Sequence, residues 1–207
     1  MGLIIISLLL TFANFGNKVD SSGIAKDSSP LGVAETTAEN TAASAKAADG
    51  DMTVQGEAAA AYLSLAAYQN LYLEDPAKSY EQALVYAQNM VEACGSVKDP
   101  DYETAYTYKI SALAGIGDAE KLSAAFNESL SHVELSQGYL QAYAQAMMKL
   151  DANEQLVTDL TAAQEQIAAN PDKKSETAEN EDEAAVSEEP QDLSSYIDTL
   201  ITQAQEQ

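Results

Sequence analysis

The stretch that decides the fold is "ALAGIGDAEKLSAAF", residues 112–126. Two glycines and an aspartate separate one run of apolar residues at helical spacing from another. Glycine is the usual residue just after a helix, and aspartate commonly caps the start of the next one. We therefore predict that one helix ends at Gly117 and that another begins after Asp118. The fold then depends on whether this helix–turn–helix unit occurs once or is repeated.

Similar turns divide the chain into three pairs of predicted helices. The pairs are residues 56–76 with 77–95, 101–117 with 118–135, and 136–150 with 151–171. A shift of 34 residues superposes the second pair on the third, with Gly117 on Asp151, Leu122 on Leu156 and Phe126 on Leu160. The first pair fits the same frame with a longer connection to the second. The unit is therefore predicted to be repeated.

A 34-residue period made of two helices resembles the tetratricopeptide repeat family. That family has an aromatic residue in the first turn of its first helix, where Tyr106 stands, and another late in its second helix, where Phe126 stands. It also has a turn like Gly117-Asp118 and a small residue at the helix crossing, where Ala83 stands. The resemblance implies an all-α fold, with a right-handed array of about three helical hairpins at residues 56–169.

The chain departs from the family pattern at several positions. Ile110 replaces a small residue, Leu122 and Leu156 replace the crossing alanine, and the terminal proline occurs only at Pro100 and Pro171. A related helical-hairpin array therefore stays open as an alternative.

In the tetratricopeptide family, the first helices of the hairpins line a concave groove that holds a peptide. The resemblance implies that this groove would present Tyr68, Gln69, Tyr72, Thr107, Tyr108, Ser111, Gln141, Gln145, Met148 and Lys149. Tyrosine and methionine suit a contact surface because they combine large area with amphipathic or adaptable ends. Only Lys149 is basic in this set, so the ligand is expected to be a neutral or basic protein or peptide rather than an acidic one.

The charge of the chain excludes several classes of partner. The net charge is -23, of which -11 belongs to residues 57–169, and the chain has no arginine. Nucleic acids and anionic lipid surfaces require a basic face. We therefore expect no nucleic-acid partner.

The segments outside the repeats differ sharply in composition. Residues 1–16 contain an apolar run of the length of a signal-peptide core or short anchor, although no charged residue precedes it. Residues 17–55 are rich in Ser, Thr and Ala, residues 170–191 are acidic, and both predict disordered linkers. Residues 192–207 predict a short amphipathic helix that either caps the array or docks on another protein. These features predict membrane association, with an extracytoplasmic location favoured and the cytoplasmic face left open.

Motifs for catalysis or metal binding are weak in this sequence. Cys94 is the only cysteine, and a buried small side chain is the favoured interpretation. His132 is the only histidine, and residues 49–57 lack both the ligands at alternating positions and a closing glutamate at the spacing that a calcium loop requires. We therefore predict no catalytic residue, no metal and no cofactor. The expected function is that of a membrane-tethered binding scaffold, and a passive self-associating spacer of the cell envelope is the alternative. The oligomeric state stays open.

Overall fold

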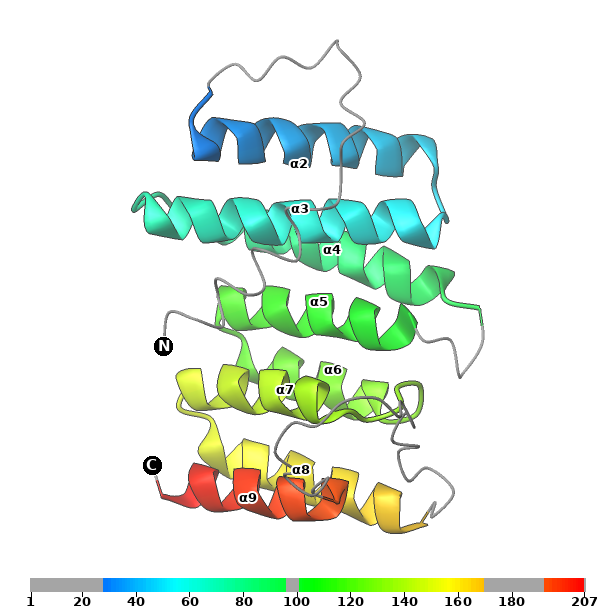
Figure 1. The fold of residues 1–207 in the computed structure, drawn as a ribbon, viewed down its shortest axis with the longest axis vertical. Coiled ribbons are helices and arrows are strands. Elements are labelled where there is room, and N and C mark those ends of the chain that lie inside the picture. The colour runs from blue at the N-terminus through cyan, green and yellow to red at the C-terminus, as the bar shows by residue number, and fades with distance from the viewer. Residues whose placement is uncertain (1–27, 96–100, 170–191, 207) are drawn as a thin grey trace, which may run out of the picture. The chain divides into compact units, whose positions relative to one another are not determined.

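The structure is a computed structural model that describes residues 28–95, 101–169 and 192–206. The regular elements in these ranges are all α-helices, shown in Figure 1. Their bounds are α2 (Pro30–Ala47), α3 (Met52–Leu71), α4 (Ala77–Ala93), α5 (Asp101–Ile116), α6 (Ala119–Ser129), α7 (Gln137–Lys149), α8 (Asn153–Ala169) and α9 (Leu193–Gln205). The prediction of an all-α fold is confirmed for the described residues.

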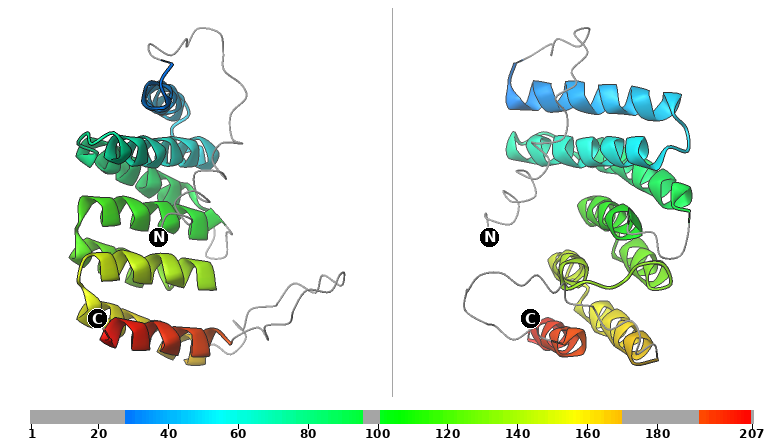
Figure 2. Two further views of the ribbon diagram at one scale, coloured as in Figure 1. Left: turned by 60° about the vertical axis from the view of Figure 1, so that its left-hand side comes forward. Right: turned by 45° about the vertical axis from the view of Figure 1, so that its right-hand side comes forward.

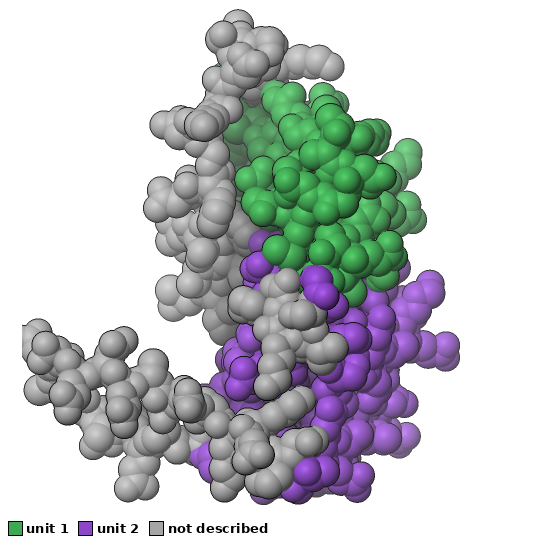
Figure 3. Space-filling model, turned by 90° about the vertical axis from the view of Figure 1, so that its right-hand side faces the viewer, with its two compact units in different colours: residues 1–94 green, residues 95–207 purple. Residues whose placement is uncertain are grey.

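The chain divides into two compact units, coloured separately in Figure 3. Unit 1 comprises Met1–Cys94 and unit 2 comprises Gly95–Gln207. The predicted N-terminal segment 1–16, the first part of the predicted spacer at 17–27 and the predicted acidic linker 170–191 lie outside the described residues.

Unit 1 contains one helix that the sequence analysis assigns to a disordered spacer. The prediction of disorder at residues 17–55 is wrong for Pro30–Ala47, which forms α2, and for the start of α3. Ser29 begins α2 because its side chain accepts a hydrogen bond of 3.1 Å from the backbone N–H of Gly32, and Pro30 occupies the first turn.

Alanine provides the buried face of α2. Its small apolar side chains recur at helical spacing and are buried at Ala34, Ala38, Ala42 and Ala45. Ala34 and Ala38 form one hydrophobic cluster with Ala61 and Leu65 of α3. Larger side chains complete this cluster, because Leu31 of α2 and Tyr62 and Tyr68 of α3 pack against it. Figure 2 shows α2 and α3 lying side by side.

One buried side chain connects α2, α3 and α4, the helices described in unit 1. Gln55 on α3 is almost fully buried and donates through Nε2 to the carbonyl of Ala45, at 3.0 Å. Its Oε1 accepts a hydrogen bond of 3.0 Å from Nδ2 of Asn89 on α4. Both ends of a buried amide are thereby satisfied, which avoids the cost of leaving a polar group unpaired.

Unit 2 contains two layers of helices. Helix α5 packs against α6 and α7, α7 packs against α8 and α9, and α6 packs against α8. Helices α5, α7 and α9 thus form one layer and α6 with α8 the other, as Figures 1 and 2 show. Helix α9 corresponds to the predicted C-terminal amphipathic helix, and it buries Ile197, Leu200 and Ala204 within unit 2.

The helix bounds in unit 2 follow the predicted turns closely, with one exception. Gly117 has φ +83 after α5, and the Asp118 side chain accepts a hydrogen bond from the backbone N–H of Lys121 at the start of α6. Helix α6 ends at Ser129, six residues before the predicted end at residue 135. His132 therefore lies in the turn after α6 and not on a helix.

Candidate functional site

The ten residues predicted to form a peptide-binding groove fall into two sets. Tyr68, Gln69 and Tyr72 belong to unit 1, at and after the end of α3. The other seven belong to unit 2 and lie on α5 (Thr107, Tyr108 and Ser111) and on α7 (Gln141, Gln145, Met148 and Lys149). None of the ten is fully buried.

The three residues of unit 1 have different environments. The side chain of Tyr68 packs against the small hydrophobic cluster formed between α2 and α3. Gln69 accepts a hydrogen bond of 2.7 Å from the hydroxyl of Ser79 on α4, so its amide helps to hold α3 against α4. Tyr72 is 48% exposed. Of the three, Tyr72 is the one most available to a partner.

The seven residues of unit 2 lie on two helices of one layer. On α7, Gln141, Gln145 and Lys149 follow one another at intervals of four residues and are all exposed. That spacing places them in one line along the helix. On α5, Thr107 and Ser111 are half-buried at the same interval, and α5 packs directly against α7. We call these seven residues on the two helices the α5–α7 surface.

A stack of aromatic rings fixes α7 against α6. The ring of Phe126 on α6 lies nearly parallel to that of Tyr143, with ring centroids 3.9 Å apart and an interplanar angle of 6°. Its centroid is also 6.0 Å from that of Tyr139. All three side chains are fully buried or nearly so. Gln141, Gln145 and Lys149 therefore lie on a helix whose opposite face packs against α6 through these aromatic rings.

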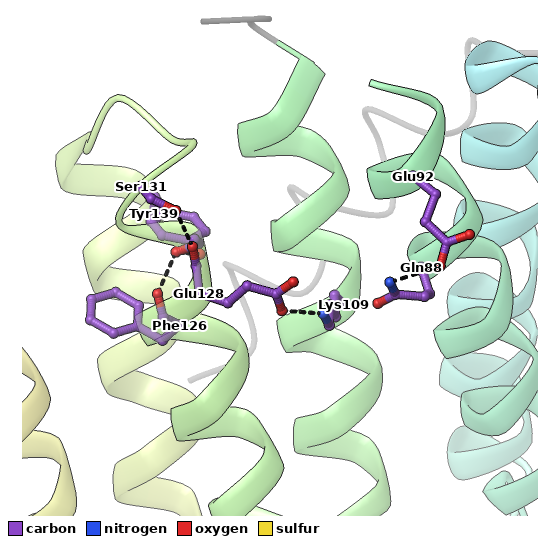
Figure 4. A network of polar contacts seen from close by, with 8 residues as sticks. Gln88, Glu92, Lys109, Phe126, Glu128, Ser131 and Tyr139 are labelled. Atoms are coloured by element: carbon purple, nitrogen blue, oxygen red, sulfur yellow. Dashed lines mark hydrogen bonds and ion pairs between the residues drawn. The ribbon is translucent and has the colours of Figure 1, made fainter. Parts of the chain in front are cut away.

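The buried tyrosines also have hydrogen-bond partners. Tyr139 Oη donates to Ser129 Oγ at 2.6 Å, and Ser129 Oγ donates to the carbonyl of Phe126 at 2.6 Å. Figure 4 shows this chain of contacts at the end of α6. Each hydroxyl is satisfied within the core, which fits a structural role for these groups.

Asp159 on α8 is a carboxylate that is only 2% exposed. Its Oδ2 accepts a hydrogen bond from Tyr143 Oη. Its Oδ1 accepts from Asn127 Nδ2 at 2.7 Å and from Gln155 Nε2 at 3.0 Å. These three bonds join α6, α7 and α8. A buried carboxylate with several donors in place is costly to disrupt, because removal of one partner leaves the others unsatisfied.

The surroundings of Tyr139 and Tyr143 raise the pKa of both phenols. Burial is the main cause for each, since the phenolate is disfavoured away from water. At Tyr143 the hydrogen bond to the Asp159 carboxylate raises the pKa further. Both phenols therefore stay neutral in the folded chain at pH values where an unfolded tyrosine ionises.

These raised pKa values predict that unit 2 loses stability in alkali. An unfolded tyrosine ionises at about pH 10, so below that pH neither the folded nor the unfolded state loses a proton from these groups. Above it the unfolded state is favoured by up to about 1.4 kcal/mol per pH unit for each buried phenol. We expect the free energy of unfolding to fall from about pH 10 upward. Tyr139→Phe should make that decline less steep, measured by urea unfolding between pH 8 and 11. An unchanged slope would contradict a neutral buried Tyr139.

Another aromatic group surrounds the only histidine. The His132 ring stacks on Tyr102, with centroids 5.0 Å apart, and lies 6.2 Å from Tyr106. Its buried Nδ1 has no hydrogen-bond partner among the described residues. Nearby, Lys109 on α5 pairs with Glu128 on α6 at 2.7 Å (Figure 4). Lys109 Nζ also lies over the Tyr106 ring, 5.3 Å from its centroid. His132 is thus part of the packing between α5 and the end of α6.

Metal-binding groups are not gathered in the described ranges. Within residues 28–95, 101–169 and 192–206, no three His, Cys, Asp or Glu side chains lie close enough together to hold an ion. Cys94 is buried, and its Sγ lies 3.6 Å from Met52 Sδ. Among the described helices, none has both the length and the apolar composition needed to cross a bilayer.

Sequence reasoning misses two features of potential importance. The contact between Tyr143 and Asp159 leaves no sequence signal beyond a polar residue in the apolar face of α8. The exposed Leu71 and Leu73 beside Tyr72 are missed because the turn is marked in the sequence by Asp75 and Pro76, four and five residues after α3 ends. Comparison with family models, with curated proteins and with solved structures gave no match.

Proposed function

We propose that this chain is a non-catalytic, membrane-tethered scaffold that binds a neutral or basic protein or peptide over the α5–α7 surface. The observation that carries the proposal is the two-layered arrangement of unit 2. It brings together seven of the ten expected contact residues on adjacent helices of one layer, where Gln141, Gln145 and Lys149 are exposed and the other four are half-buried.

The repeat interpretation has support from matched positions in unit 2. Leu122 and Leu156 are both completely buried, and so are Phe126 and Leu160, at the spacing of 34 residues. The same spacing separates Gly117 from Asp151, which both have a left-handed backbone after the helices α5 and α7. These equivalences favour two stacked hairpins of tetratricopeptide type, with α9 as the helix that covers the last one.

The chemistry of the α5–α7 surface favours a neutral or basic ligand. Gln141 and Gln145 offer amide donors and acceptors, and Met148 offers a flexible apolar contact. Lys149 is the one cation in the set, and the chain as a whole is strongly acidic. An acidic ligand would therefore be repelled during approach, whereas a basic one would be attracted. The membrane tether in the proposal rests on the apolar composition of residues 2–15.

Site-specific photocrosslinking of the full-length chain in an extract of its native host tests the proposal. A benzoylphenylalanine at Gln145 probes the α5–α7 surface, and one at the exposed Thr161 on α8 probes the other layer. We expect an adduct with a second protein from position 145 and none from position 161. Equal capture at both positions, or adducts only with another copy of the chain, would contradict the proposal and favour the self-associating spacer.

A further inference from the structure

The end of α3 in unit 1 exposes three large apolar residues in succession. Leu71 is 73% exposed, Tyr72 is 48% exposed and Leu73 is 95% exposed. We call Leu71–Leu73 the α3 tip; it lies in the turn between α3 and α4 at the left edge of Figure 1. Single exposed leucines are common on protein surfaces, but a continuous apolar group is a sign of an interaction site.

Leu73 also has an unfavourable backbone conformation. Its φ is +61, in the left-handed region that side chains other than those of glycine, asparagine and aspartate rarely adopt. The backbone N–H of Glu74 donates to the carbonyl of Gln69 at 2.8 Å, and that of Leu73 donates to the carbonyl of Asn70 at 3.3 Å. This is the hydrogen-bond pattern of a Schellman helix end, in which glycine normally occupies the position of Leu73.

Among the described helices, α5 and α7 are also followed by a left-handed residue, and both use a suitable residue type. The residue after α5 is Gly117, with φ +83, and α7 is followed by Asp151, with φ +56. The chain therefore uses favourable residues at the corresponding positions of α5 and α7. At the corresponding position of α3 the chain has Leu73, which is exposed. Its side chain therefore gains no burial energy to offset the cost of the left-handed backbone. Strain of this kind often marks a functional position.

The α3 tip is held in place by two side-chain contacts to α4. Gln69 accepts from Ser79 at 2.7 Å, and Asn70 Nδ2 donates to Tyr80 Oη at 3.0 Å. These bonds fix the last turn of α3, so its apolar side chains are presented in a defined arrangement. A preorganised apolar group loses less entropy on binding than a flexible one.

The charges next to the α3 tip indicate what it contacts. Glu74 and Asp75 follow it directly and are exposed, and Lys78 is the nearest cation in sequence. With a net charge of -23, a second copy of the chain would be repelled, and so would an anionic membrane surface. Carboxylates this close to the apolar side chains complement basic groups at the edge of a pocket.

We propose that the α3 tip inserts into an apolar pocket with a basic rim on another protein. Leu73 and Leu71 fill the pocket, while Glu74 and Asp75 pair with the basic groups around it. This binding site lies in unit 1 and does not rest on the function proposed for the α5–α7 surface. The variants that test the two proposals are also different.

The test uses the full-length chain with benzoylphenylalanine at Tyr72, in an extract of the native host. The matched control carries the photocrosslinker at Val85, an exposed apolar residue on α4 in the same unit. We expect a protein adduct from position 72 and none from position 85. The adduct should be lost in Leu73→Asn and in the double variant Glu74→Lys, Asp75→Lys.

Leu73→Asn separates binding from folding because the two effects have opposite directions. Asparagine tolerates the left-handed conformation, so the melting temperature should stay the same or rise. The affinity for the captured protein, measured by calorimetry, should fall by about 10-fold to 100-fold, as expected for loss of a buried leucine. Leu73→Gly provides a second variant with the same expected loss of affinity.

Several results would overturn this proposal. An adduct that survives Leu73→Asn would show that Leu73 does not fill a pocket. Adducts only between copies of the chain would indicate self-association. Co-sedimentation with phosphatidylcholine or phosphatidylserine vesicles, together with no protein adduct, would indicate a lipid surface. The absence of any adduct at position 72 would also count against a protein partner.

Discussion

Replacement of Phe126 with alanine should lower the free energy of unfolding of unit 2 by about 3–5 kcal/mol. The Phe126 side chain is completely buried and stacks on two tyrosine rings, so its removal leaves a cavity at the junction of α6 and α7. Small domains have only about 5–15 kcal/mol of stability in total, so this loss would be severe. Urea unfolding followed by circular dichroism measures it, and the near-ultraviolet tyrosine signal should weaken because the stack is lost.

Ala124 on the same helix provides the control for this prediction. It is exposed, so Ala124→Gln should change the free energy of unfolding by less than about 0.5 kcal/mol. A loss below about 1 kcal/mol in Phe126→Ala would mean that the neighbouring rings close the cavity. The aromatic stack would then not be what holds α7 in place.

Replacement of Ala38 with leucine should separate α2 from α3. Ala38 is 1% exposed and lies in the middle of the alanine face of α2. Additional methyl groups in such a contact cost about 1–3 kcal/mol or more. Helix α2 packs chiefly on α3 in the described part of unit 1, and most of the stability of a helix in a protein comes from such packing of one face. We therefore expect α2 to lose its structure while α3 and α4 retain theirs.

Hydrogen–deuterium exchange checks this prediction peptide by peptide. In Ala38→Leu, amides of Pro30–Ala47 should exchange much faster, and amides of α4 should keep their protection. Ala43→Leu is the matched control, because Ala43 is exposed on the same helix and should leave exchange unchanged. Equal protection of α2 in both variants would show that the alanine face does not hold it against α3.

Much of the helical organisation could be predicted because large apolar residues and turn residues mark it. Pro76, Gly95 and Gly117 each fall between helices, as expected from their backbone preferences. The spacing of buried residues such as Leu122 and Phe126 likewise distinguishes the inner faces of the helices in unit 2. These signals are local, so a single sequence contains them.

The sequence analysis does not predict helix α2 because the buried face of this helix consists of alanines and one glycine, Gly32. Alanine occurs in both disordered and helical segments, and without larger residues the period of the apolar face is hard to recognise. The N-terminal signal was nevertheless present, since Ser29 precedes Pro30 at the first turn. A periodic search that counts alanine at Ala34, Ala38 and Ala42 would have found this helix.

The sites themselves were less predictable because they depend on contacts between distant residues. Asp159 meets Tyr143 from a different helix, and neither residue type indicates the other in sequence. The left-handed Leu73 was missed because glycine is the usual signal of such a helix end and is absent there. Residues that break a local rule are common at functional positions.

The measurement that tests the central claim most directly is the affinity of two lysine variants for the protein captured at Gln145. Gln145→Lys alters the α5–α7 surface, and Thr161→Lys makes the same addition on the other layer of unit 2. For Gln145→Lys, calorimetry should show an affinity reduced by at least about 10-fold. The longer lysine side chain obstructs the contact and, for a basic ligand, adds a charge of the same sign. Thr161→Lys should bind as the unchanged chain does. Equal affinities for the two variants would contradict the assignment of the α5–α7 surface as the binding site.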